Sequence, residues 1–254
     1  MTNKLLDELA ICGLNAVKAR AQFNPDSVNR FFLREDRLPL FTGLCGRLAA
    51  RKRPYKITND AELEKICKTG RHQGVVAMVE KPEIEPLGRE DLSLWNNESK
   101  TGVVLHSIGN DHNLGAIIRC AAFFDAYFVV ISEEDREKTL TTSACRVAEG
   151  GVEHVHFRSV RRTEAFLREA SQVLFVAGAS SRSRRRIDEI DSLIAEKTVG
   201  GKRPGIALVF GNEETGLPDY VEEECPVLLR IPGSGNIESL NVSCAASVFL
   251  QRVS

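Results

Sequence analysis

The sequence is poor in the features that mark secreted, membrane-spanning and metal-binding proteins. Its seven cysteines are an odd number, lie far apart and form no Cys-x-x-Cys pair, which argues against a disulfide framework and a structural zinc site. No apolar run approaches the roughly 18 residues needed to span a bilayer. These absences predict a soluble, cytoplasmic protein with reduced thiols, no metal and no membrane partner.

The net charge of −1 over 254 residues excludes an overall basic field, but positive charge is concentrated locally. Each cluster is either a solvated surface or a contact for nucleic-acid phosphates, and for the first two the sequence does not choose. The third is the densest and favours phosphate contact. The clusters are Arg47/Arg51/Lys52/Arg53, Arg158/Arg161/Arg162 and Arg182/Arg184/Arg185/Arg186.

Helical and strand patterns divide the chain into two α/β parts. Residues 1–85 form a small domain, and a charged segment with Pro82 and Pro86 leads into an expected linker at 86–99. Residues 100–254 form the larger domain, where short β-branched runs alternate with helices. This alternation predicts a parallel sheet covered on both faces, whose ligands bind beyond the carboxyl ends of the strands.

The expected elements follow from these patterns. In the first part we expect helices over 13–23, 39–50 and 61–68 and strands over 28–33, 55–57 and 75–79. In the second part we expect strands over 102–105, 127–132, 173–177, 206–210 and 227–231. The helices expected between and after them cover 114–124, 163–170, 187–196 and 239–251.

Three polar loops follow strands of the larger domain, at 107–119, 210–218 and 231–243. The first leads into a helix that Asn110 or Asp111 can cap. The second is rich in glycine but has no phosphate-binding fingerprint, and its two glutamates disfavour phosphate. The third runs into the last helix, where backbone N–H groups without helical partners can bind a polar ligand. Together the loops predict one ligand site.

The loops offer amide, hydroxyl, carboxylate and guanidinium groups but no strong nucleophile and no metal-ligand spacing. Such a set indicates binding and orientation rather than covalent catalysis, and it suits group transfer from an activated donor. His112 can relay a proton or can be an exposed loop residue without a role.

The three loops resemble the motifs of the SpoU/TrmH family of RNA ribose 2′-O-methyltransferases. The similar segments are Asn113–Arg119, Leu208–Glu213 with Gly216-Leu217, Ile231-Pro232 and Ser239–Ser243. They occur in the family's order and cover the chain from about residue 100 onward. Within the family the chain is most similar to the uncharacterised bacterial YfiF-type tRNA/rRNA methyltransferases.

This resemblance implies a SPOUT-type parallel α/β domain with a C-terminal trefoil knot, preceded by a small L30e-like domain that binds substrate RNA. It further implies a homodimer that methylates a ribose 2′-hydroxyl of tRNA or rRNA with S-adenosylmethionine. The positions that match the family's catalytic residues are Asn113, Arg119, Glu213, Ser239 and Asn241. The positions whose backbone would contact the cofactor are Gly211, Ile231 and Leu240.

Arg119 is a poor candidate for the base that removes the hydroxyl proton, because a guanidinium with a pKa above about 12 rarely gives up its own proton. We therefore expect Arg119 to clamp an RNA phosphate. Glu149, Glu214 and Gly233 stand where the family pattern usually has other residues. They leave a catalytically silent RNA-binding or ribosome-assembly module as the alternative. A nicotinamide-dependent oxidoreductase is disfavoured because its glycine fingerprint is missing.

Overall fold

The computed structural model describes residues 8–133 and 140–254, which form two compact units. The first unit comprises the described residues of Met1–Glu83 together with Leu140–Glu153. The second comprises those of Ile84–Thr139 together with His154–Ser254. The parallel α/β fold expected for the larger domain is confirmed, but the division of the chain differs from the expected 1–85, 86–99 and 100–254.

The first unit is built on a four-stranded sheet in the order β1-β4-β2-β3. β4 pairs antiparallel with both β1 and β2, and β3 adds in parallel at the edge. Ala10, Cys12, Leu63, Val76 and Met78 form a buried cluster between the sheet and α3. The elements are β1 (Glu8–Cys12), α1 (Leu14–Phe23), β2 (Val28–Leu33), α2 (Thr42–Ala50), β3 (Tyr55–Ile57), α3 (Asp60–Cys67) and β4 (Val75–Glu80), with 3-10 turns at Pro25–Ser27 and Glu35–Leu40.

The segment 140–153 corrects the expected boundary, because it packs on α1 and β1 rather than on the larger sheet. It carries α6 (Thr142–Ala148) and a 3-10 turn over Gly151–His154. Glu153 is buried and accepts from the Arg20 guanidinium at 2.7 Å and from Asn24 Nδ2 at 2.6 Å. Gly150 has a φ of 96°, and a Cβ there would lie 2.6 Å from Ala19 Cβ. Only glycine therefore allows this close contact.

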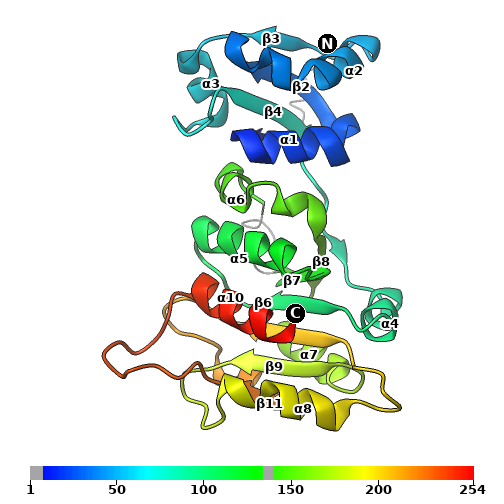
Figure 1. Ribbon diagram of the computed structural model, residues 1–254, viewed down its shortest axis with the longest axis vertical. Helices are drawn as coiled ribbons and strands as arrows, with labels where there is room; N and C mark the ends of the chain where they lie inside the picture. The colour runs from blue at the N-terminus through cyan, green and yellow to red at the C-terminus, as the bar shows by residue number, and fades with distance from the viewer. Residues whose placement is uncertain (1–7, 134–139) are drawn as a thin grey trace. The chain divides into compact units, whose positions relative to one another are not determined.

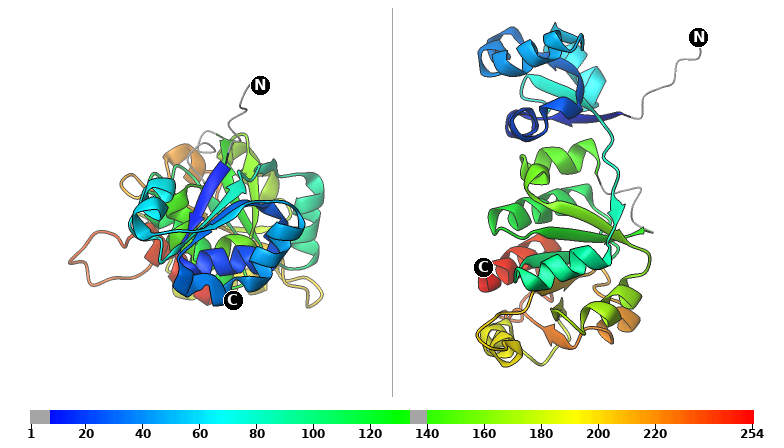
Figure 2. Two further views of the ribbon diagram at one scale, coloured as in Figure 1. Left: turned by 90° about the horizontal axis from the view of Figure 1, so that it is seen from above. Right: turned by 90° about the vertical axis from the view of Figure 1, so that its right-hand side faces the viewer.

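The second unit contains a seven-stranded sheet in the order β11-β9-β10-β6-β7-β8-β5 (Figures 1 and 2). Every recorded pair in this sheet is parallel. In the two central strands Leu105 lies opposite Phe210, so the loops that follow them leave from the same edge. The strands are β5 (Glu85–Pro86), β6 (Thr101–Leu105), β7 (Phe128–Ser132), β8 (His156–Val160), β9 (Phe175–Ala179), β10 (Ile206–Phe210) and β11 (Val227–Leu229).

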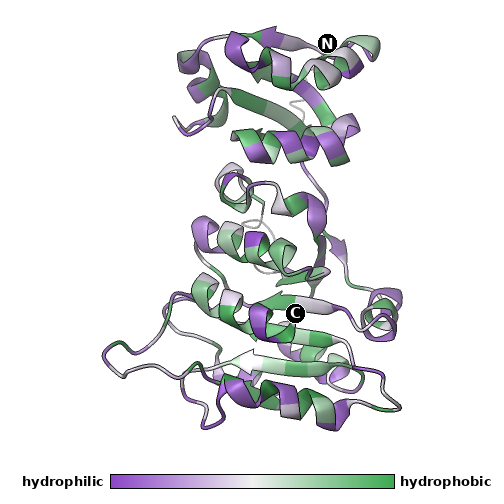
Figure 3. Cartoon of the chain, viewed as in Figure 1, coloured by the Kyte–Doolittle hydropathy of each residue, from purple (hydrophilic) through white to green (hydrophobic). Residues whose placement is uncertain are grey.

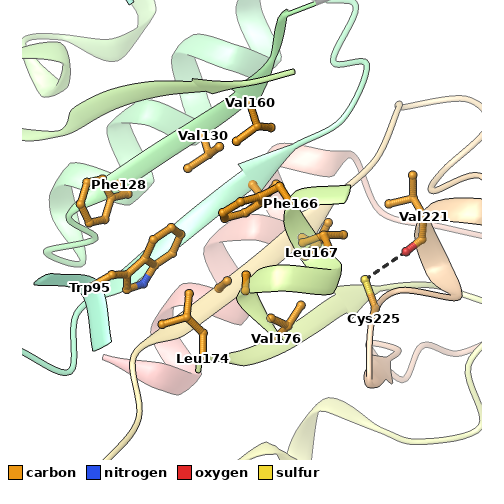
Figure 4. Packing of buried hydrophobic residues seen from close by; sticks show 14 of the residues in the cluster. Trp95, Phe128, Val130, Val160, Phe166, Leu167, Leu174, Val176, Val221 and Cys225 are labelled. Carbon is orange, nitrogen blue, oxygen red and sulfur yellow. Dashed lines mark hydrogen bonds between the residues drawn. The ribbon is translucent and has the colours of Figure 1, made fainter. Parts of the chain in front are cut away.

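One face of this sheet is covered by α4 (Arg89–Asn97), α7 (Thr163–Ala170) and α9 (Asp219–Glu222). Trp95 is fully buried here and lies 4.9 Å from Phe128 and 6.4 Å from Phe166 between ring centroids (Figure 4). Its indole Nε1 donates to the Ile206 carbonyl at 2.9 Å. The residues expected as a linker at 86–99 thus form a core helix.

The opposite face is covered by α5 (Asp111–Phe123), α8 (Ile190–Lys197) and α10 (Val242–Val253). Of these helices, α10 contacts both α5 and α8. Phe249 of α10 meets Phe210 at the end of β10, with ring centroids 5.5 Å apart. Figure 3 shows that each of these helices carries both hydrophilic and hydrophobic residues. Within the described chain, no helix has the length and apolar content to cross a membrane.

Candidate functional site

The three polar loops meet at the carboxyl edge of the larger sheet, and Glu213 connects two of them. Its carboxylate accepts hydrogen bonds from the backbone N–H groups of Gly109 and Asn110, both at 3.2 Å. Asn113 Nδ2 donates to the same carboxylate at 2.8 Å. The loop after β10 therefore holds the loop that begins α5.

Asn241 brings in the third loop. Its Nδ2 donates to Asn113 Oδ1 at 2.9 Å, so Asn113 bridges Glu213 and Asn241. Asn241 Oδ1 accepts from the Ser243 backbone N–H at 2.9 Å, which makes Asn241 the N-cap of α10. The predicted helix start at Ser239 is corrected to Val242 because this cap ends the loop.

The hydrogen bonds around Glu213 control its ionisation. Burial by itself raises the pKa of the carboxyl, but the donors from Asn113, Gly109 and Asn110 stabilise the charged form. The net effect lowers the pKa below its ordinary value. Glu213 is consequently a carboxylate at neutral pH.

A cavity of about 340 Å³ lies beside this network. Its walls come from the loops after β9, β10 and β11 and from the first turns of α10. All three residues expected to contact a cofactor through their backbone, Gly211, Ile231 and Leu240, line this cavity. The volume falls in the range of small-molecule sites. Other residues that line the cavity are Arg182, Glu213, Glu214, Leu217, Glu222, Leu229, Arg230, Glu238, Ser239, Val242 and Phe249.

Gly211 is required by the packing of its loop. A Cβ at this position would lie 2.4 Å from the backbone of Gly216. The turn is closed by Gly216 N–H donating to the Asn212 carbonyl at 2.9 Å. Asn212 also donates through Nδ2 to the Ser107 carbonyl and accepts at Oδ1 from Glu214 N–H, both at 2.9 Å. Asn212 is a site residue that the sequence reasoning missed, although its place between Gly211 and Glu213 was a signal.

The other two expected catalytic residues, Arg119 and Ser239, are exposed. Arg119 is exposed on α5, six residues after Asn113, and it is not among the described residues that line the cavity. Ser239 is exposed but lines the cavity. His112 is exposed, and its backbone N–H donates to the side chain of Asn110, the N-cap of α5.

The unusual residues and the densest basic cluster have defined places. Glu214 lines the cavity, whereas a Cβ at Gly233 would meet nothing within 4 Å. Glu149 ends α6 with a φ of 48° and accepts from Asn15 Nδ2 at 3.2 Å. Arg182 lines the cavity and pairs with Asp219 at 2.8 Å and Glu222 at 2.9 Å. The phosphate contact that was predicted for its cluster is therefore not available to Arg182.

A parallel sheet with a polar cavity at its carboxyl edge defines an α/β domain that binds a small molecule where the strands end. The chain belongs to the SpoU rRNA methylase family, whose model matches residues 100–251. A second model, for RNA 2′-O ribose methyltransferase substrate binding, matches residues 10–85. This confirms the predicted family and with it the class of enzyme, an S-adenosylmethionine-dependent RNA ribose 2′-O-methyltransferase.

Individual relatives agree with this assignment. The chain is 33% identical over 244 residues to the 23S rRNA (guanosine-2′-O-)-methyltransferase RlmB of Nitrosomonas europaea, covering 94% of this chain and 88% of that protein. It is 28% identical to the uncharacterised tRNA/rRNA methyltransferase YfiF of Escherichia coli O157:H7, covering 96% and 67%. The fold matches an AdoMet-bound rRNA methyltransferase from Sinorhizobium meliloti with a TM-score of 0.73 at 21% identity, covering 97% and 87%.

Proposed function

We propose that this chain methylates the 2′-hydroxyl of a ribose in ribosomal or transfer RNA, with its catalytic groups at the carboxyl edge of the larger sheet. The observation that carries the proposal is the shared cavity. Three stretches separated in sequence, around Gly211, Ile231 and Leu240, line one hollow. The Glu213–Asn113–Asn241 network borders it.

The chemistry of the cavity fits S-adenosylmethionine. Leu217, Leu229, Val242 and Phe249 offer an apolar wall against which a purine can lie. Four carboxylates, of Glu213, Glu214, Glu222 and Glu238, line the cavity against two guanidinium groups, of Arg182 and Arg230, and this excess of negative charge suits a ligand with a sulfonium and an ammonium group. When bound, the cofactor supplies an activated methyl group. We propose that the backbone at Gly211, Ile231 and Leu240 holds it.

The residues of the network then act mainly by orientation. Aligning the reacting groups can lower a barrier by about 7–11 kcal/mol. Asn113 and Asn241 fix each other, and Glu213 fixes Asn113. We propose that Ser239 and Asn241 orient the ribose or the cofactor. Because its pKa is lowered and three donors already occupy its oxygens, Glu213 is a positioning residue rather than the proton acceptor. The hydroxyl proton then goes to water or to an RNA phosphate.

Arg119 is proposed to clamp an RNA phosphate. Its exposure on α5 suits a contact with a large ligand, and its guanidinium can bind phosphate through two parallel hydrogen bonds. The first unit and the basic clusters are proposed to hold the RNA around the target nucleotide. The match of residues 10–85 to a substrate-binding model supports this. Homodimerisation and a C-terminal trefoil knot are further proposals, and they rest on the family.

The experiment pairs calorimetry with a methylation assay on ribosomal and transfer RNA. We expect the unmodified chain to bind S-adenosylmethionine and to transfer its methyl group to a ribose. Arg119→Lys keeps the charge but loses the bidentate geometry, so kcat/KM for RNA should fall about tenfold or more while cofactor affinity stays unchanged. Arg252→Lys, which alters a guanidinium paired with Asp191, is the control.

Wild-type kinetics for Arg119→Lys would rule out the clamp. The alternative, a catalytically silent RNA-binding module, predicts RNA binding without methyl transfer. Glu214 favours that alternative only if its carboxylate, on the cavity wall, prevents cofactor binding. Calorimetry with Glu214→Gly therefore distinguishes the two: restored cofactor binding in the variant alone would support the silent module.

A further inference from the structure

A second cavity, of about 510 Å³, lies at the same carboxyl edge of the larger sheet and has no part in the function proposed above. Its walls come from the ends of β6 and β7 and from α7 and α9. The charged and polar residues that line it are His106, Ser132, Arg162, Thr163, Glu164, Arg168, Tyr220, Glu223 and Glu224.

A buried histidine holds an aromatic ring at the mouth of this cavity. His106 is only 8% exposed, and its Nδ1 lies 3.1 Å from Oγ1 of the buried Thr163. Its Nε2 lies 3.4 Å from the Tyr220 hydroxyl. The two rings meet edge to face, with centroids 6.0 Å apart and planes at 81°. Tyr220 nevertheless stays 53% exposed, so the held ring still offers surface to a ligand.

The residues that line the cavity argue against phosphate and against a metal ion as its ligand. Arg162 pairs with Glu164, and Arg168 Nε lies 3.1 Å from the Glu224 carboxylate. Glu223 makes no side-chain hydrogen bond or ion pair to any residue that the structure describes, which leaves a net negative wall that repels phosphate. The described residues include no group of three or more His, Cys, Asp or Glu side chains able to hold a metal ion.

The cavity is connected to the methyl-transfer site through one short stretch of backbone. His106 N–H donates to the Phe210 carbonyl at 2.9 Å, and the next residue, Ser107, accepts from Asn212 Nδ2 at 2.9 Å. Gly109, which donates to Glu213, follows two residues later. Three residues of chain span at most about 11 Å. A nucleotide can therefore reach from one site to the other.

We propose that this cavity receives the base of an unstacked RNA nucleotide, with the exposed face of Tyr220 as the stacking surface and Glu223 as the acceptor for an exocyclic amino group. His106 is a positioning residue that holds Tyr220. The inference rests on the proposed function and extends it to base selection. Unstacked bases are recognised by stacking on aromatic rings and by hydrogen bonds to their edges, and carboxylates accept from base amino groups.

The direct test needs no catalysis. The imidazole resonances of His106 are followed by NMR while nucleoside 5′-monophosphates are added to the full chain, with inorganic phosphate as a separate titration. Guanosine and inosine differ only by one exocyclic amino group, and cytidine carries an amino group at C4 where uridine carries a carbonyl. We expect the amino-bearing member of each pair to bind about fivefold tighter or more, and Glu223→Ala, which removes the acceptor, to abolish the difference.

Variants of Tyr220 separate stacking from the hydroxyl. Tyr220→Ala should weaken nucleotide binding by roughly 5- to 150-fold, the effect of losing one base–aromatic stack. Tyr220→Phe keeps the ring and should stay within about threefold of the unmodified chain. Phe123→Ala, which removes an 80% exposed ring from α5, is the control and should have no effect.

Equal shifts with phosphate alone, or no response to any nucleotide, would overturn the proposal. So would unchanged binding by Tyr220→Ala. These outcomes are separate from failure of the proposed function, which would show as absent methylation by the unmodified chain. In the methylation assay Tyr220→Ala should raise KM for RNA and change the preference between target bases, while calorimetric affinity for S-adenosylmethionine stays unchanged.

Discussion

At the scale of single residues, Glu213 organises the site because it is held charged. Three donors from the loop at 109–113 converge on its carboxylate. These hydrogen bonds outweigh burial and keep its pKa below the ordinary value. The same donors lose their acceptor if the carboxylate is removed, so one residue determines the geometry of two loops.

Glu213→Gln tests this role through its pH dependence. Since the folded pKa is lowered, the stabilisation is complete above the unfolded pKa of about 4.3 and is lost as pH falls through the folded value. We expect the variant to be about 1–3 kcal/mol less stable near pH 7. This difference should shrink on acidification. Urea denaturation at a series of pH values measures it, and a difference that stayed constant from pH 7 to pH 2 would contradict a charged Glu213.

The residue types of the site could be predicted, but their contacts could not. Asn113, Glu213 and Asn241 were found through the three motifs, and the structure connects them by hydrogen bonds. The motifs could not separate them from Arg119, which is exposed on α5, the helix that also carries Asn113. Asn212 was missed although it lies between Gly211 and Glu213, because its importance comes from hydrogen bonds to the backbone of Ser107 and Glu214 that exist only in the folded chain.

At the scale of elements, α4 shows how composition can mislead. The residues from 81 to 91 combine two prolines with many charges, which is typical of a linker. The helix that follows nevertheless buries Leu92 and Trp95. Gly102 and Gly205 accommodate the indole and its backbone, since a Cβ at Gly102 would lie 2.4 Å from the ring and one at Gly205 2.5 Å from the Trp95 carbonyl. These distant glycines are why the local pattern failed.

Trp95→Ala measures the contribution of α4 to the second unit. Removing the buried indole leaves a cavity beside Phe128 and Phe166 and removes the hydrogen bond that Trp95 donates to the Ile206 carbonyl. We expect a loss of about 3–5 kcal/mol in the free energy of unfolding, measured by chemical denaturation. Phe123→Ala is the control, since Phe123 is 80% exposed and its loss should cost within about 0.5 kcal/mol. Equal stability of the two variants would mean that α4 is not part of the core.

Most of the expected strands are present, but β1, β5 and β8 were not expected from the sequence. β2, β3, β6 and β10 lie within a residue of their expected bounds. β8 was missed because it lies near the sheet edge, where His156 is exposed and Arg158 interrupts the pattern. The helix over 142–148 was also missed. Its seven residues are too few for a periodic pattern to be distinguished.

At the scale of the whole molecule, the chain does not divide into consecutive domains. Residues 140–153 follow β7 and precede β8 in the sequence, yet they belong to the first compact unit. The buried pair of Arg20 and Glu153 belongs to that unit. Such contacts join residues more than 100 positions apart, and they depend on the assembled fold. Sequence periodicity reports only local structure and could not have placed this segment.

The net charge of the whole molecule does not show where unpaired positive charge lies. With a net charge of −1, RNA binding must rely on basic groups that are not already neutralised. The guanidinium groups of Arg47 and Arg51 are paired with Asp26. Within the part of the chain that the structure describes, the side chains of Lys52, Arg161, Arg184 and Arg185 form no ion pair and no hydrogen bond. Arg184 and Arg185 lie together in the densest of the three clusters, where both can meet phosphate.

The double substitution of Arg184 and Arg185 to alanine should accordingly weaken RNA binding and reduce its dependence on salt. Each lost phosphate contact lowers the slope of log affinity against log salt by roughly 0.7–0.9, so we expect a total change of about 1 to 2. Arg186→Ala is the matched control, because its guanidinium is paired with Asp188 at 3.0 Å. Filter binding at several salt concentrations measures the slopes. If the control changed the slope as much as the double variant, pairing within the protein would not determine which arginines reach the RNA.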